Sequence, residues 1–142
     1  GLNKGLAENR VRKAERTLQD TPVYLPVPVA TSPPQREMAN SPVAHAEIVA
    51  IERAAKSLGS WRLDNCVLVV TLEPCAMCAG AIAQARIPKL VFGAWDEKAG
   101  AVGSQWDLLR DPRQLYQPEV VAGLMADECA ELLKEFFKAK RS

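Results

Sequence analysis

Two cysteines three residues apart, Cys75 and Cys78, are the side chains with the clearest potential for chemistry. They follow Pro74, and the apolar residues after them recur at helical spacing, so the sequence predicts a helix with this proline at its first position. Cysteines at positions i and i+3 share one face of a helix, and the positive end of the helix dipole favours their thiolate form. Two thiolates held in this way can form half of a tetrahedral zinc site.

One further strong metal ligand is available, because His45 is the sole histidine of the chain. The cysteine pair alone is also compatible with a redox pair, half of a structural zinc knuckle, or a chance arrangement in a helix. No second pair of this kind exists, since Cys66 and Cys129 are isolated. Three protein ligands would leave the fourth position open to water, which is typical of catalytic zinc sites and not of structural ones.

Glu47 lies two residues beyond His45. At that spacing its carboxylate can lie beside a metal-bound water without binding the metal, accept a proton from the water and pass it on. His-x-Glu followed after a gap by Pro-Cys-x-x-Cys is a signature of zinc-dependent nucleoside and nucleobase deaminases. The alternative interpretation is that His45 and Glu47 are an ordinary surface or core pair on a helix.

Two helix starts are needed to bring these residues together. Residues 41–42, Ser-Pro, have the types favoured at a helix start, and the apolar spacing predicts a helix from there to residue 58, ending at a glycine. A continuous apolar run over residues 66–72 predicts a strand covered on both faces. His45 and Cys75 should then lie in the first turns of two facing helices.

Further strands are predicted over residues 89–95 and 119–124, and a short helical piece over residues 106–109. The last helix, residues 126–140, has an acidic start and a basic end that match the helix dipole. Because strands alternate with helices, we expect the α/β class, as a three-layer α/β/α sandwich around a mixed central sheet.

The first 42 residues differ in character from the rest. The sequence predicts a basic helix with a thin apolar stripe over residues 1–19. Residues 20–42 contain six of the ten prolines. Residues 23–29 have strand-forming side chains, but Pro26 and Pro28 remove two ladder donors. This stretch is therefore predicted to be an edge strand or an extended segment.

Length and composition indicate an ordinary globular protein. With 142 residues, 48% hydrophobic and 25% charged, one domain over residues 1–142 is expected. Its catalytic core would be residues 43–142, which contain the deaminase signature, and residues 1–42 would be a divergent N-terminal segment. No apolar run approaches the roughly 20 residues of a membrane span and no secretory signal opens the chain, so we expect a cytoplasmic protein without a membrane partner. A net charge of +1 gives no overall argument for nucleic-acid binding. Gly1 in place of a start methionine indicates a trimmed or engineered N-terminus.

From Ser41 onward the chain resembles the bacterial tRNA-specific adenosine deaminases, which have the cytidine-deaminase-like fold. The segments that carry the resemblance are 41–47, 59–63, 71–80, 85–87, 91–94, 100–104, 126–130 and 136–137. The resemblance implies hydrolytic conversion of a tRNA wobble adenosine to inosine by a homodimer with one zinc per chain. It also implies that His45, Cys75 and Cys78 are the zinc ligands and Glu47 the proton shuttle.

An anticodon stem-loop can present an unstacked base to such a site. We expect the end of the last helix to contact it, with Phe137 stacking on a loop base and Lys140 and Arg141 binding phosphate. The chain departs from the family at three places. Where the family has a Pro-Val-Gly-Ala strand followed by a hairpin, Pro22-Val23 is followed here by Tyr24-Leu25, and the segment up to His45 is several residues shorter. Pro34 stands where the family has an asparagine that contacts base and ribose, and Leu115-Tyr116 replaces an Asn-His pair.

Two other functions use the same residues. A deaminase of free guanine, cytosine or cytidine would combine this zinc centre with a closed pocket. An inactive deaminase-like partner subunit would hold zinc for structure alone, but such a subunit needs no proton shuttle, so Glu47 argues against it. The small residues Ala79, Ala81, Ala83 and Ala85 would allow close approach in a homodimer, or would pack against the chain's own sheet.

Overall fold

The computed structural model describes residues 23–27 and 41–141. The helix predicted over residues 1–19 and the position of Pro34 lie outside these residues. The side chains of Lys140 and Arg141 are also outside the description, although their backbone belongs to the last helix.

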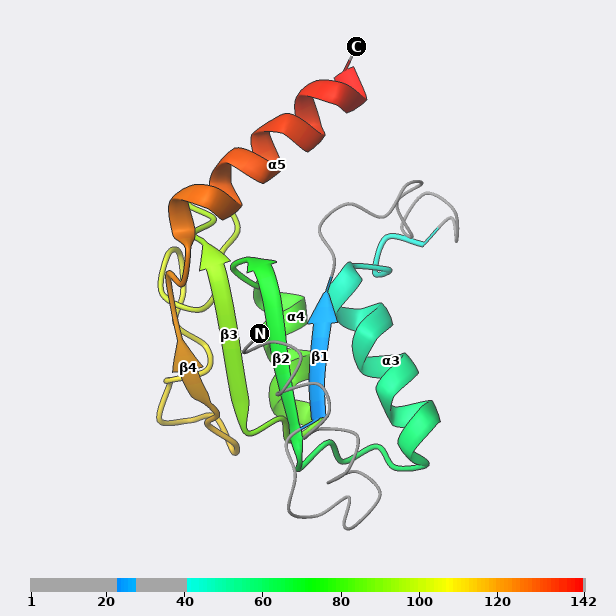
Figure 1. The fold of residues 1–142 in the computed structure, drawn as a ribbon. Helices are drawn as coiled ribbons and strands as arrows, with labels where there is room; N and C mark the ends of the chain where they lie inside the picture. The colour runs from blue at the N-terminus through cyan, green and yellow to red at the C-terminus, as the bar shows by residue number, and fades with distance from the viewer. Residues whose placement is uncertain (1–22, 28–40, 142) are drawn as a thin grey trace, which may run out of the picture.

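Within the described residues, four strands form one sheet, in the order β1-β2-β3-β4 (Figure 1). Their bounds are β1 Val23–Val27, β2 Cys66–Leu72, β3 Lys89–Ala94 and β4 Glu119–Val121. All three neighbouring pairs are parallel. The expectation of a mixed sheet was therefore wrong for the described strands, because each connection between them returns the chain to the same end of the sheet.

The strand bounds follow the sequence patterns closely. β1 lies at one edge of the described sheet, as its prolines predict, because an edge strand can lack ladder donors on one side. β2 has the predicted bounds and is largely buried. β4 ends three residues earlier than predicted, since Gly123 and Met125 have the left-handed φ angles of 76° and 53° and turn the chain toward the last helix.

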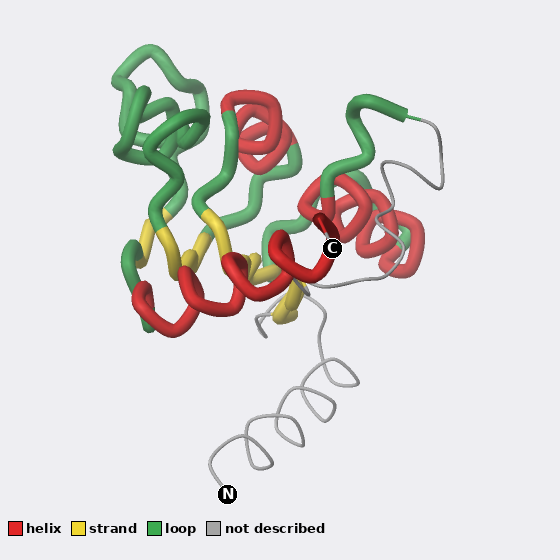
Figure 2. The backbone as a smooth tube through the Cα atoms, turned by 90° about the horizontal axis from the view of Figure 1, so that it is seen from above, coloured by secondary structure: helices red, strands yellow, loops and turns green. Residues whose placement is uncertain are grey.

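Helices cover both faces of the sheet and make the three layers that were predicted. α3 (Ala46–Leu58) and α4 (Ala76–Gln84) lie on one face, and α5 (Ala126–Arg141) lies on the other (Figure 2). Between the layers, Leu68, Ile82 and Phe92 are completely buried. Within the described residues, no helix combines the length and the apolar character that crossing a membrane requires.

α3 begins at Ala46, four residues later than the sequence pattern indicates. The hydroxyl of Ser41 accepts a hydrogen bond from the backbone N–H of Val43 at 3.3 Å, so it closes a local turn instead of capping a helix. His45 is the N-cap residue, with φ −68° and ψ 152°. The predicted end of the helix is confirmed, because Gly59 has the left-handed φ of 66° that is typical after the last helical residue.

α4 also begins later than predicted. Cys75 is its N-cap residue and Ala76 its first helical residue, so Pro74 precedes the cap and is not the first helical position. Three of the four alanines that were candidates for a dimer contact, at positions 79, 83 and 85, are buried in the core of this chain. Their small size therefore serves packing of α4 against its own sheet.

Residues 106–109, predicted as a short helical piece, form a bridge and a turn. The backbone N–H of Gly103 donates to the carbonyl of Trp106, and Val102 pairs with Asp107. These contacts fold the segment back on the preceding loop, so its backbone groups are paired without a helix.

Candidate metal centre

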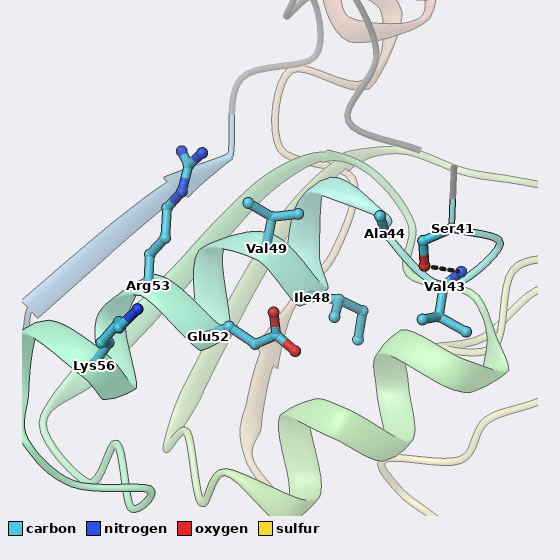
Figure 3. A pocket seen from close by; sticks show the side chains of 8 residues that line it. All are labelled: Ser41, Val43, Ala44, Ile48, Val49, Glu52, Arg53 and Lys56. Carbon is cyan, nitrogen blue, oxygen red and sulfur yellow. Dashed lines mark hydrogen bonds between the residues drawn. The ribbon is translucent and has the colours of Figure 1, made fainter. Parts of the chain in front are cut away.

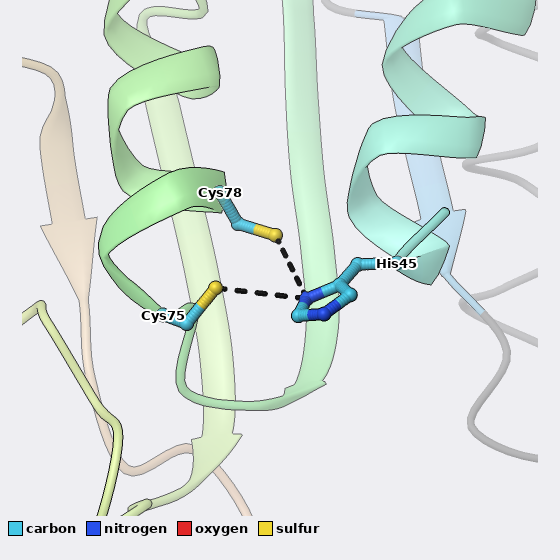
Figure 4. A group of neighbouring side chains, drawn as sticks. All are labelled: His45, Cys75 and Cys78. Atoms are coloured by element: carbon cyan, nitrogen blue, oxygen red, sulfur yellow. Dashed lines mark hydrogen bonds between the residues drawn. The ribbon is translucent and has the colours of Figure 1, made fainter. Parts of the chain in front are cut away.

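Three side chains from two helix starts converge on one point. His45 is the N-cap of α3, Cys75 is the N-cap of α4, and Cys78 lies in the first turn of α4. The Nδ1 atom of His45 lies 3.6 Å from the Sγ of Cys75 and 3.5 Å from the Sγ of Cys78 (Figure 4). The three donor atoms all lie within 4.8 Å of one another, so this group is positioned to bind a metal ion.

The topology explains why these residues meet although 30 positions separate His45 from Cys75. α3 follows β1 in the chain and α4 follows β2. Because β1 and β2 are parallel, their carboxyl ends lie along the same edge of the sheet. Both helices therefore start at that edge, which is where open α/β sheets usually bind their ligands. The positive ends of both helix dipoles point at the group and favour thiolate sulfurs.

The spacing of the donors fits a tetrahedral cation. A zinc ion with bonds of about 2.3 Å to sulfur and about 2.0 Å to nitrogen, at tetrahedral angles, would place nitrogen and sulfur about 3.5 Å apart. The two distances from His45 Nδ1 are 3.6 and 3.5 Å. Two sulfurs and one imidazole nitrogen are also the donor types that zinc prefers, and three donors leave one position of a tetrahedron open.

Cys78 is completely buried. Burial raises the pKa of its thiol above the ordinary value, and the negative charges of Glu47 and Cys75 raise it further. A thiolate at this position therefore needs a cation beside it, and metal coordination is the interaction that deprotonates a buried thiol.

Glu47 lies in the first turn of α3, next to the metal group. Its Oε2 is 3.6 Å from the Sγ of Cys78, and its side chain is half-buried. The three converging donor atoms belong to other residues. The carboxylate is therefore placed beside the candidate metal position, as the spacing from His45 predicts.

The residues predicted to contact RNA belong to α5, on the opposite face of the sheet from α3 and α4 (Figure 2). Phe137 is 47% exposed, whereas Lys140 and Arg141 are described only as helical backbone. Leu115, which replaces an asparagine of the resembling family, is 90% exposed. Tyr116 has the guanidinium of Arg86 over its ring at 5.6 Å, so it belongs to a surface cation–π pair.

A cavity of about 390 Å³ lies along α3 (Figure 3). It is lined by Ser41, Val43, Ala44, Ile48, Val49, Glu52, Arg53 and Lys56, and none of the three converging donors is among them. This cavity is therefore separate from the candidate metal centre.

One residue beside the centre was missed by the sequence analysis. Glu73 is buried at the end of β2, although it is charged. Burial alone would raise the pKa of this carboxyl, but hydrogen bonds from Ser104 and from the backbone of Asp96, Ser104 and Val102 outweigh it and lower the pKa. The available signal was a carboxylate placed directly after a fully apolar strand, where an unpaired charge would be costly.

Comparison with known proteins places these observations in a family context. The protein-family model of the MafB19-like deaminases matches residues 29–141. The tRNA-specific adenosine deaminase of Bacillus subtilis (strain 168) is 47% identical over 106 residues, which are 75% of this chain and 66% of that protein. That of Haemophilus influenzae is 48% identical over 102 residues, 72% of this chain and 59% of that protein. The chain thus spans less than two thirds of the length of these relatives.

Solved structures agree with the fold. A structure reported in work on A-to-I editing by tRNA:A34 deaminases at the wobble position superposes with a TM-score of 0.67 at 45% identity, covering 70% of this chain and 72% of the other. Guanine deaminase from Nitrosomonas europaea superposes with a TM-score of 0.57 at 28% identity, covering 72% and 61%. The predicted cytidine-deaminase-like α/β fold is therefore confirmed.

Proposed function

The chain belongs to the MafB19-like deaminase family, and we propose that it is a zinc-dependent tRNA adenosine deaminase. It would convert the wobble adenosine of an anticodon stem-loop to inosine by hydrolysis. The observation that carries the proposal is the convergence of His45, Cys75 and Cys78 at distances that suit one zinc ion, with Glu47 beside them. Identities of 47% and 48% to proteins named tRNA-specific adenosine deaminase support adenosine in tRNA as the substrate.

His45, Cys75 and Cys78 would hold one zinc per chain through one nitrogen and two sulfur atoms. When bound, zinc supplies Lewis acidity that makes water a nucleophile at neutral pH. Glu47 would accept a proton from the attacking water and deliver it to N1 of the adenine, where it stays, and would then carry the remaining proton of the new hydroxyl group to the leaving amino group. One C6–O bond forms, the C6–N bond breaks, and the products are inosine and ammonia.

The target base must leave its stack to reach the centre, and a nucleotide in a loop leaves it at low cost. We propose that the end of α5 contacts the stem-loop, with Phe137 as the stacking residue and Lys140 and Arg141 as the phosphate-binding residues. The 47% exposure of Phe137 supports its part in this contact.

We also propose that the chain acts in the cytoplasm as a single deaminase domain and as a homodimer. The alanines of α4 do not support the dimer, because three of them pack inside this chain. The dimer therefore rests on the resemblance to bacterial tRNA-specific adenosine deaminases. Sedimentation at micromolar concentration tests it, and a species near 15.5 kDa would argue for a monomer.

A second candidate function is deamination of a free base. The observation that favours this second function is the structural similarity to guanine deaminase, with a TM-score of 0.57 at 28% identity. Ammonia release from zinc-loaded protein should be compared for an anticodon stem-loop, adenosine, guanine and cytidine. We expect release from the stem-loop alone. Release from guanine or cytidine alone would contradict the tRNA substrate, and no release from any of the four would indicate an inactive subunit.

A further inference from the structure

Among the residues whose side chains the structure describes, Glu73 is the one buried residue with a charged or strongly polar side chain, with 2% of its surface exposed. It follows the last residue of β2, and only Pro74 lies between this buried charge and Cys75, a candidate metal ligand. Burying a carboxylate is costly unless hydrogen bonds replace its water. The hydrogen-bond donors that replace this water therefore show which part of the chain the Glu73 carboxylate holds in place.

Four hydrogen bonds from one loop saturate the carboxylate of Glu73. Its Oε1 accepts from the backbone N–H of Asp96 at 3.0 Å and from the hydroxyl of Ser104. Its Oε2 accepts from the backbone N–H groups of Val102 and Ser104, both at 3.0 Å. All four donors lie in residues 96–104, which we name the clamped loop, and bonds to an ionised acceptor are about twice as strong as neutral ones.

The clamped loop in turn contacts the backbone of the metal-ligand segment. The N–H of Ala101 donates to the carbonyl of Pro74 at 2.8 Å, and Gly100 pairs with Cys75 in an isolated antiparallel bridge. The loop that Glu73 holds is therefore the loop that lies against Cys75.

Gly100 shows how closely the loop approaches the carboxylate. A Cβ atom at this position would lie 2.3 Å from the Cδ of Glu73 and 2.4 Å from each carboxylate oxygen. The backbone of Gly100 does not have a left-handed φ, so the close approach alone requires glycine here. The backbone of Gly100 therefore packs directly against the carboxylate of Glu73, with no room for a side chain between them.

We propose that Glu73 is a positioning residue for the metal centre. By holding the clamped loop against Pro74 and Cys75, it fixes the backbone from which the Cys75 sulfur faces His45. This inference rests on the proposed function in one respect, namely that His45, Cys75 and Cys78 form a zinc site. Loss of a group that orients a metal ligand typically weakens metal binding about 10- to 100-fold.

The test uses Glu73→Gln in the full chain, with zinc and cobalt as probes. Glutamine has nearly the same shape, but its NH₂ group cannot accept the hydrogen bonds that one carboxylate oxygen accepted. We expect zinc affinity, measured by competition with a chelator, to fall about 10- to 100-fold. We also expect the absorption spectrum of the cobalt-loaded protein to change, because it reports ligand geometry and not stability.

Two glycine variants provide matched controls. Gly100→Ala places a methyl group against the carboxylate and should reproduce both effects of Glu73→Gln. Gly80→Ala, within α4, has nothing within 4 Å of its added Cβ and should leave zinc affinity and the cobalt spectrum unchanged. Should Glu73→Gln fail to fold, Ser104→Ala removes one donor to Oε1 and should change both readouts in the same direction, to a smaller extent.

The outcomes separate this inference from the proposed function. If the unmodified protein binds zinc and Glu73→Gln loses stability while its zinc affinity and cobalt spectrum stay unchanged, Glu73 is structural only and the inference is overturned. An unchanged spectrum in Ser104→Ala would overturn it in the same way. If the unmodified protein binds neither zinc nor cobalt, the proposed function falls first and this inference falls with it.

Discussion

The thiol of Cys78 shows why the three converging donors need a cation between them. It is completely buried, its Sγ lies 3.5 Å from His45 Nδ1, and the Oε2 of Glu47 lies 3.6 Å from the same sulfur. Burial and the neighbouring negative charges oppose its ionisation. A bound zinc ion reverses that preference, so metal content and the chemistry of this one sulfur are linked.

Cys78→Ala should therefore abolish stoichiometric zinc. The variant keeps two donors, which are too few for a stable tetrahedral site. Elemental analysis of protein purified without added metal measures the result. Cys129→Ala is the matched control, because Cys129 is a free cysteine outside the metal group and its loss should leave zinc in place. A disulfide between Cys75 and Cys78 with no metal in the unmodified protein would contradict the assignment.

Glu47→Gln should keep zinc and lose rate. The amide has the same size as the carboxylate but cannot carry the proton, and general acid–base groups contribute about 10²- to 10⁴-fold. Single-turnover deamination with zinc-loaded protein measures the change. Glu52→Gln, on the same helix and in the wall of the separate cavity, should retain the full rate. Retained rate in Glu47→Gln would remove the proton shuttle from the mechanism.

Residue types and spacing predict a centre of His45, Glu47, Cys75 and Cys78, and the structure brings these side chains together, because each belongs to a short local pattern. Glu73 could not be found in that way. Its donors lie 23 to 31 residues further along the chain, and only the folded loop brings them to the carboxylate. A carboxylate directly after an apolar strand indicates a charge that needs partners, but no local pattern identifies partners that lie so far along the chain.

At the scale of elements, the helix starts were the least predictable features. Ser41 and Pro42 have the residue types of a capped start, yet the hydroxyl of Ser41 closes a turn and α3 begins at Ala46. Serine followed by proline suits both structures, so local pattern cannot choose between them. The choice matters for function, because it makes His45 the N-cap and not a residue inside the helix.

Two glycines at helices should respond to alanine with opposite signs. Gly59 has a φ of 66° and open space around it, so Gly59→Ala should lower the free energy of unfolding by about 1 kcal/mol through backbone strain alone. Gly80 lies within α4, also with open space, so Gly80→Ala should raise it by about 0.5–1 kcal/mol. Urea unfolding of zinc-loaded protein measures both. Equal signs would contradict the conformations described for these helices.

At the scale of the whole molecule, the alternation of strands and helices was sufficient to predict the three layers. The direction of the strands was not predictable from it. The connection between β3 and β4 contains no helix, so the element order alone does not fix the direction of β4. The same order of elements is compatible with a mixed sheet and with the parallel pairing that is observed. The prolines of β1 were the more useful signal, because they placed that strand at the edge.

RNA binding should depend on the end of α5. The double variant Lys140→Ala with Arg141→Ala should weaken stem-loop binding and reduce the slope of log affinity against log salt by about one to two, because two phosphate contacts are lost. Zinc content should not change. Arg62 and Lys89 are a matched control pair of cations, and Lys89 lies at the start of β3. Replacement of both by alanine should leave the slope of log affinity against log salt unchanged. The reverse result would place the RNA along another face.

If this centre hydrolyses the wobble adenosine as proposed, the new oxygen at C6 comes from water. An anticodon stem-loop should be incubated with zinc-loaded protein in water enriched in heavy oxygen, and the product digested and analysed by mass spectrometry. We predict inosine at the wobble position alone, carrying one heavy oxygen at C6, and none with Glu47→Gln. Absence of inosine with zinc bound, or inosine without the label, would contradict hydrolysis of the wobble adenosine at this centre.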